Sequence, residues 1–217
     1  MQISNYSSDI HKHILACWGA ASAASQSTLF KFSVEHGKQL ILLAKNGQHS
    51  SESSFIAFIK SIENCSSQKD FDEWHSNAIE NMLGGKDVDA VFEKINAEKP
   101  KKSSKLNRQY YSYGIAAKLM NCYLKIFHLS SFGHAQYGKY IHPPVDAILL
   151  KKLLEVESDL FSFQFKKSSM YHDGSIPKWT SLDGHEYAMV ISKIQTFISE
   201  QDADGLWKIE FAWIGHQ

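Results

Sequence analysis

A lysine and an aspartate in the second half of the chain are the two residue types needed to break a bond at a sugar carbon. Lys118 falls near the start of one predicted helix and Asp146 at the start of the next. An unprotonated lysine amine can attack such a carbon and form a Schiff base. A carboxylate can stabilise the positive charge that develops there and handle protons during the displacement. The pair is therefore suited to cleaving an N-glycosidic bond.

The positions of both residues at helix starts favour this chemistry. The pKa of a free lysine is near 10.4, so a nucleophilic lysine must be held as the neutral amine. The positive end of a helix dipole and burial in a closed pocket would both favour that form at Lys118. Asp146 follows two prolines, which can lead into a helix, and a carboxylate is favoured at the N-cap. The alternatives are a lysine on a polar surface stripe, which Lys118 would form with Asn121, Lys125 and His128, and an aspartate that only caps a helix.

The two motifs together resemble a known family. Gly114-Ile115-Ala116-Ala117-Lys118 resembles the hairpin-then-lysine turn of the helix-hairpin-helix DNA glycosylases, and Pro144-Val145-Asp146 resembles the Pro-Val-Asp that carries their catalytic aspartate. The similarity is greatest to the 8-oxoguanine DNA glycosylase branch, including its compact archaeal type, and covers residues 113–154. The chain departs from the family pattern at Ala116, where the hairpin usually has a second glycine.

The resemblance implies an all-α fold, a compact two-lobed helical bundle of the helix-hairpin-helix glycosylase type. It also implies that Lys118 is the Schiff-base nucleophile and Asp146 the catalytic carboxylate, with nicking of the abasic strand by β-elimination. The implied partner is double-stranded DNA from which a damaged or modified base is flipped. That base would be 8-oxoguanine, as in repair, or a hypermodified base of phage DNA, as in antiviral defence. No cofactor is implied.

A flipped base needs aromatic faces and hydrogen-bonding edges around it. The tail, residues 206–213, is rich in aromatic residues, and a C-terminal aromatic helix closes the base pocket in the resembling enzymes. The predicted pocket residues are Trp213, Trp74, Pro144, His142 and Phe211, and Trp179 and Trp207 are further aromatic candidates. Each aromatic residue also suits a place in the core.

A basic loop, residues 99–105, precedes the central stretch and suits contact with phosphates or simple solvation. The predicted contacts to the DNA backbone are Lys101, Lys102, Lys105, Arg108 and Gly114. The formal net charge is +0, so DNA binding would require the charges to be segregated. Arg108 is the sole arginine, which excludes base reading by several arginines in the major groove.

Length and composition fit one glycosylase-like domain spanning all 217 residues, of which 43% are hydrophobic. We expect an N-terminal helical lobe of about 1–98 and a lobe of about 99–217 that carries the hairpin-like turn, the catalytic helices and the aromatic tail. There is no apolar run of 18 residues, so no membrane span is expected. Three widely spaced cysteines without a Cys-x-x-Cys pair predict reduced thiols, a cytoplasmic location and no metal site. We expect a monomer.

Apolar spacing predicts helices through most of the chain and little period-two alternation. The expected helices are 13–24, 29–44, 55–62, 71–83, 88–96, 114–129, one after 146, 186–200 and 206–213. Trp18 is expected to be a buried anchor of the first helix. Phe30, Val34, Ile41 and Leu42 are expected in the core from the second helix, and Phe71, Trp74, Ile79 and Met82 from the fourth.

Three functions are compatible with these patterns. The first is a DNA glycosylase, with lyase activity implied by the lysine nucleophile. The second is a non-catalytic helical module that binds modified DNA or a protein partner. The third is a helical protein with no role on DNA, in which the basic loop is only solvated.

Overall fold

Helices make up the regular structure of the chain. The computed structural model describes residues 8–25, 33–98, 105–129, 136–156, 165–166, 170, 176–201 and 205–213. Within those ranges every named element is a helix, and the extended residues contribute an isolated bridge between Met170 and Pro177. The prediction of an all-α fold is confirmed.

Eight α-helices and seven shorter helical segments are described. The α-helices are α1 (Ser8–Ala24), α2 (Val34–Leu42), α3 (Glu52–Lys60), α4 (Gln68–Gly84), α5 (Val88–Ala97), α6 (Tyr113–Leu124), α7 (Ala147–Val156) and α8 (Gly184–Glu200). The 3-10 helices are η2 (Leu43–Lys45), η3 (Ser61–Asn64), η5 (Arg108–Tyr110), η7 (Gln136–Tyr140), η9 (Trp179–Ser181) and η10 (Leu206–Trp213), and η6 (Lys125–Leu129) is π-helical. None of these described helices has the length and apolar character needed to cross a membrane.

Short polar side chains start several of these helices. Serine or aspartate oxygens accept a hydrogen bond from the backbone N–H three residues later, which satisfies a donor that the first turn leaves unpaired. These N-caps are Ser33, Ser51, Ser67, Ser112 and Asp183. At α2, α4 and α8 the third helical residue also bonds back to the cap, completing a capping box.

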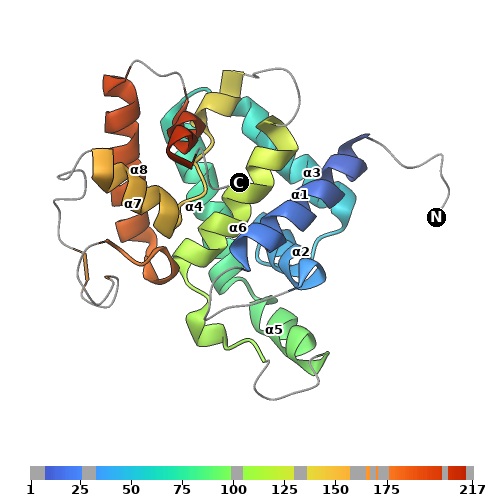
Figure 1. Ribbon diagram of the computed structural model, residues 1–217. Coiled ribbons are helices and arrows are strands. Elements are labelled where there is room, and N and C mark those ends of the chain that lie inside the picture. The colour runs from blue at the N-terminus through green and yellow to red at the C-terminus, as the bar shows by residue number, and fades with distance from the viewer. Residues whose placement is uncertain are drawn as a thin grey trace.

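Helix α6 occupies the centre of the bundle, with α1, α2 and α3 on one side and α7 and α8 on the other (Figure 1). Every residue from Gly114 to Leu124 is buried. A helix that is buried on all sides belongs to the core rather than to the surface. Lys118 and Asn121 of the predicted polar stripe therefore lie inside the protein, which excludes the alternative that Lys118 is a surface lysine.

Helix α1 packs against α6 through small residues, and this corrects one expectation. Its buried residues are His13, Ala16, Cys17, Ala20, Ala21 and Ala24. Trp18 was expected to be buried but is 61% exposed. The alanine face allows the two helix backbones to approach closely, and the indole on the opposite face is left in solvent.

The predictions for the second and fourth helices are confirmed in part. Ile41 and Leu42 are buried, whereas Val34 opens α2 and is 38% exposed, so its predicted core position is wrong. Phe71, Ile79 and Met82 of α4 are fully buried, and Trp74 is partly buried against the core. Phe30 lies outside the described residues. Each helix that the sequence predicts falls on a described helix, and most ends differ by a few residues.

The division of the chain into two lobes near residue 98 stays a prediction. The contact of α1 with α6 is the most extensive between any two helices, although the two lie in different predicted lobes. The lobes therefore share a continuous core of buried side chains.

Candidate functional site

Lys118 lies in the second turn of α6. Its side chain is 5% exposed and its Nζ atom lies 3.1 Å from Asp146 Oδ2. A helix dipole acts mainly within the first turn, so Lys118 lies beyond its strongest effect. The site is thus a lysine–carboxylate pair in which the lysine is buried and the carboxylate side chain is 15% exposed.

Asp146 uses its two oxygens for two tasks. Oδ1 accepts the backbone N–H of Leu149 at 3.0 Å and so caps α7, while Oδ2 faces Lys118. The predicted N-cap position of Asp146 is therefore observed, and capping does not occupy the oxygen that faces the amine. The preceding residues Pro144 and Val145 are buried and lead into this cap.

The aromatic face beside the lysine belongs to Trp179, which opens η9. The centroid of its ring lies 4.5 Å from Lys118 Nζ, a distance at which a ring face attracts an ammonium. Gly114 allows this approach, because a Cβ atom there would lie 1.7 Å from the carbonyl oxygen of Trp179. The Gly114 N–H donates to the carbonyl of Leu182 at 3.2 Å. This bond uses the backbone N–H of Gly114, a residue that was predicted to contact the DNA backbone.

A second ion pair lies next to the first. Lys125 Nζ donates to Glu210 Oε2, and Lys125 begins the π-helical segment η6, a feature frequent at functional sites. Burial raises the pKa of Glu210, and the charge of Asp146 adds to this rise. Glu210 Oε1 is buried and has no hydrogen-bond partner among the described residues. The second pair therefore holds a carboxylate oxygen that can still accept or, when protonated, donate a hydrogen bond.

The thiol of Cys122 connects the two pairs. Burial raises its pKa to about 12, and the charges of Lys118, Lys125, Glu210 and Asp146 all act on it. Cys122 lies one turn after Lys118 on α6 and three residues before Lys125, the first residue of η6. Both ion pairs therefore form one charged cluster along one face of this helix.

A second set of polar side chains forms a hydrogen-bonded network, in which the Asp72 side chain is 42% exposed and the other members are buried. It consists of His75 and Asp72 from α4, Asn121 from α6, Tyr187 from α8, and His142. His142 lies in the loop of residues 141–146 before α7, which contains Pro143 and Pro144 and is called the proline loop below. Burial acts to raise the pKa of Asp72, but hydrogen bonds from His142 and Gln68 hold it below its ordinary value. Each side chain in the network has a hydrogen-bond partner, as buried polar groups require.

Buried histidines predict that the protein loses stability in mild acid. Burial lowers the pKa of His75 to about 3 and that of His128 to about 4, below the 6.5 expected in the unfolded chain. The unfolded chain binds more protons in this window, so the stabilisation is complete above about pH 7, begins to be lost near pH 6.5 and continues to fall until the pH reaches the folded pKa values. We expect the free energy of unfolding to fall by roughly 2–4 kcal/mol between pH 7 and pH 5. Urea unfolding at both pH values measures it.

The control for this prediction is an exposed histidine. His128→Gln is expected to make the dependence on pH shallower, whereas the exposed His49→Gln is expected to leave it unchanged. A free energy of unfolding that stays constant from pH 7 to pH 5 would contradict the neutral state of the buried rings.

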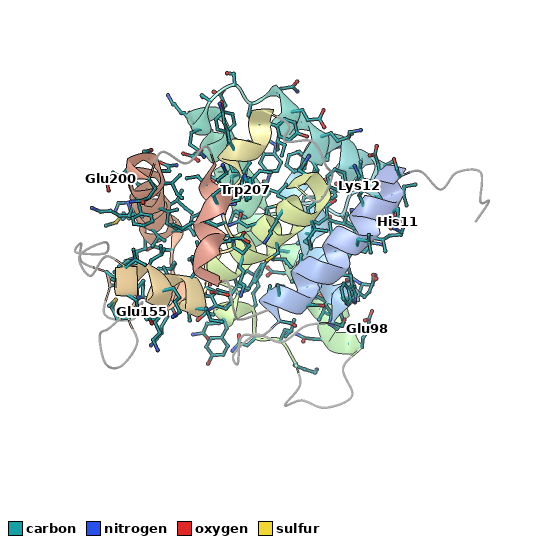
Figure 2. The ribbon with its side chains drawn as sticks, turned by 45° about the horizontal axis from the view of Figure 1, so that its top comes forward. His11, Lys12, Glu98, Glu155, Glu200 and Trp207 are labelled. Atoms are coloured by element: carbon teal, nitrogen blue, oxygen red, sulfur yellow. The ribbon has the colours of Figure 1, made fainter. Side chains whose placement is uncertain are left out.

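The other predicted pocket residues have the following positions. Trp74 donates to Ser61 Oγ at 3.1 Å and stacks on Phe58 with ring centroids 5.0 Å apart, so it packs against α3 and η3. His142 is buried in the polar network, and Pro144 is buried next to Asp146. The side chains of Phe211 and Trp213 lie outside the described residues. In Figure 2, Trp207 marks η10, which lies between α8 and α6.

The predicted DNA-backbone residues do not form one described surface. Lys101 and Lys102 lie outside the described residues, and Lys105 is exposed. Arg108 donates to the carbonyl of Leu83 and lies over the rings of Phe92 and Tyr111, so its guanidinium is engaged within the protein. Of the predicted set, Lys105 is thus the described side chain placed for contact with a phosphate.

A pocket of about 340 Å³ lies apart from the lysine–carboxylate pair. Its lining is formed by Gln68, Lys139, Tyr140, Gln195, Ile198, Ser199, Gly205 and Leu206. Neither Lys118 nor Asp146 lines it. Within the described ranges, no group of three or more His, Cys, Asp or Glu side chains is arranged to hold a metal ion.

Sequence reasoning did not assign a role to Asn121, Glu210 or Tyr187. Glu210 is the one carboxylate among the aromatic and apolar residues of 206–213, and that isolation was an available signal. Asn121 belongs to the predicted polar stripe of α6. Comparisons of the chain with protein-family models, with curated proteins and with solved structures found no match.

Proposed function

We propose that this chain is a DNA glycosylase with associated lyase activity, in which Lys118 is the nucleophile and Asp146 the catalytic carboxylate. The observation that carries the proposal is the 3.1 Å contact between these two side chains, which lie 28 residues apart in sequence. Such a buried ion pair adds little stability over apolar side chains of the same size, so a chemical role is the better explanation of its presence.

The proposed reaction begins with transfer of a proton from Lys118 to Asp146. The lone pair of Nζ then forms a bond to the sugar C1′, and the electrons of the C1′–base bond leave with the base. The base takes up the proton that the attacking amine releases, so the protons balance. A second shift of the nitrogen lone pair breaks the C1′–O4′ bond, O4′ takes up the proton held by Asp146, and a protonated Schiff base between C1′ and Nζ remains. Asp146, again a carboxylate, takes up a C2′ proton, and the electrons of that C–H bond expel the 3′-phosphate and nick the strand.

In this proposal the Lys125–Glu210 pair binds the extruded base. A lysine beside a carboxylate presents hydrogen-bond donors next to an acceptor, as the edge of a nucleobase requires. The two candidate substrates are 8-oxoguanine and a hypermodified base of phage DNA. The ring of Trp179 covers Lys118 Nζ. The sugar C1′ can therefore reach Nζ only after this ring or other neighbouring side chains move.

Borohydride trapping tests the proposal. The protein would be mixed with end-labelled duplexes that each carry one candidate base, 8-oxoguanine and hypermodified phage cytosines among them, in the presence of borohydride. We expect a labelled covalent adduct with one of these classes, because borohydride reduces the Schiff base to a stable amine. A duplex with the unmodified base at the same position is the control.

The other outcomes separate the alternatives. Alkali-labile sites without an adduct would mean a glycosylase that uses water as its nucleophile, and would remove Lys118 from the proposed role. Salt-dependent binding to modified DNA without adducts or abasic sites would overturn the enzymatic proposal in favour of a binding module. Absence of salt-dependent binding as well would favour a helical protein with no role on DNA.

A further inference from the structure

Asn121 links α6, the helix that carries the Lys118 amine, to the proline loop through a hydrogen bond. It lies three residues after Lys118 on α6 and is 0% exposed. Its Nδ2 atom donates to the carbonyl of Pro143 at 3.0 Å and to the hydroxyl of Tyr187 at 2.8 Å. Its Oδ1 atom lies 2.7 Å from Nε2 of His75. One buried amide therefore bonds three groups from three different segments.

The orientation of this amide follows from its partners. A backbone carbonyl can only accept, so the NH₂ group of Asn121 must face Pro143. Its oxygen then faces His75, whose Nε2 must carry the proton. A neutral imidazole with this tautomer agrees with the pKa of His75, which burial lowers to about 3.

The donor direction continues through the rest of the network. Tyr187 accepts a bond from Asn121, so its own proton goes to Nδ1 of His142 at 3.2 Å. The other ring nitrogen of His142 donates to the carboxylate of Asp72 at 2.8 Å. Every donor in this series has one acceptor, so the amide cannot turn over without leaving a buried group unpaired.

The link from Asn121 to the carboxylate is short and stiff. The bonded carbonyl belongs to Pro143, three residues before Asp146. The ring of Pro144 fixes the φ angle of that residue, which removes one backbone rotation from the link. The side chain of Val145 is buried as well. A carbonyl held at Pro143 therefore holds the carboxylate against α6.

We propose that Asn121 is a positioning residue that sets the 3.1 Å separation between Lys118 Nζ and Asp146 Oδ2. The amine and the amide lie on the same rigid helix, so the bond to Pro143 fixes the loop relative to the amine. The expected effect on excision rests on the function proposed above, whereas the effect on the separation of the two side chains does not.

A pair of asparagine variants tests this assignment. Asn121→Leu removes the amide without adding a charge. Asn81→Leu is the matched control, because Asn81 Nδ2 donates to the carbonyl of Ala44 at 3.1 Å in a different part of the bundle. We expect Asn121→Leu to lower the single-turnover rate of base excision by about 10- to 100-fold with an unchanged Kd for DNA, since a displacement of about 1 Å has such an effect. In its crystal structure the lysine–carboxylate separation should exceed hydrogen-bond range. Asn81→Leu should change neither quantity.

A wild-type rate and an unchanged 3.1 Å separation in Asn121→Leu would overturn the assignment. If that variant does not fold, Asn121→Asp serves in its place, because it keeps an oxygen facing His75 and removes both donors. If the wild-type protein excises no base from any duplex, the proposed function fails, and the separation in the crystal structures alone then decides the role of Asn121.

Discussion

Lys118→Gln is expected to form no borohydride-trapped adduct with DNA and to excise the base at roughly a thousandth of the wild-type rate or less. The change removes the amine that lies 3.1 Å from Asp146 Oδ2 and that is the proposed nucleophile. Glutamine is chosen because its amide can still donate to the carboxylate, so the partner in the interior is not left unpaired. Adduct yield on denaturing gels and the single-turnover rate are the measurements.

The matched control is Lys152→Gln. Lys152 lies on α7, where it forms an ion pair with Glu155 at 2.7 Å, so this variant removes the same charge and one ion pair from the next helix. Its adduct yield is expected to equal that of the wild type. A wild-type yield in Lys118→Gln would assign the nucleophile to another amine. Circular dichroism and urea unfolding establish that both variants are folded.

Gly114→Ala is expected to lower the free energy of unfolding by about 3 kcal/mol or more. The new Cβ atom would lie 1.7 Å from the carbonyl oxygen of Trp179 and 2.9 Å from its carbonyl carbon. Both are backbone atoms, so η9 must move away from α6 as a unit. That movement would break the bond from the Gly114 N–H to Leu182 and withdraw the indole from Lys118. Urea unfolding measures the stability, and the adduct yield should fall with it.

Gly84→Ala is the control for this substitution. Gly84 ends α4, and a Cβ atom there would meet nothing within 4 Å. We expect a change of less than about 1 kcal/mol, in the direction of higher stability because alanine has the higher helix propensity. Equal effects of the two substitutions would mean that the close approach of η9 to α6 does not stabilise the fold.

Local patterns predicted the helices because helix formation depends on neighbours in sequence. Apolar residues at a spacing of three or four mark one face of a helix, and serine or aspartate marks its start. The cap at Asp146 is the clearest example, since the prolines before it and the helix after it are both visible in sequence. The predicted start of α6 near Gly114 is likewise within one residue of the observed one.

The same patterns failed where burial depends on the whole bundle. Trp18 and Val34 are apolar residues on helices, yet both are exposed because the facing helix packs on another side. Lys118 and Asn121 belong to a polar stripe, yet both are buried because helices surround α6 on all sides. Periodicity shows that a helix has two faces, but it does not show how many neighbours the helix has.

The sequence by itself determined that the chain is helical and that Lys118 and Asp146 lie near the starts of two successive helices. Only the tertiary structure decided that the two side chains meet at 3.1 Å, that Trp179 covers the amine and that Glu210 joins Lys125 beside them. The physical reason is distance along the chain: these contacts join residues 28 and 85 positions apart in the two ion pairs, and no local interaction encodes them. They form when helices pack so as to bury their apolar faces, and packing is a property of the whole chain.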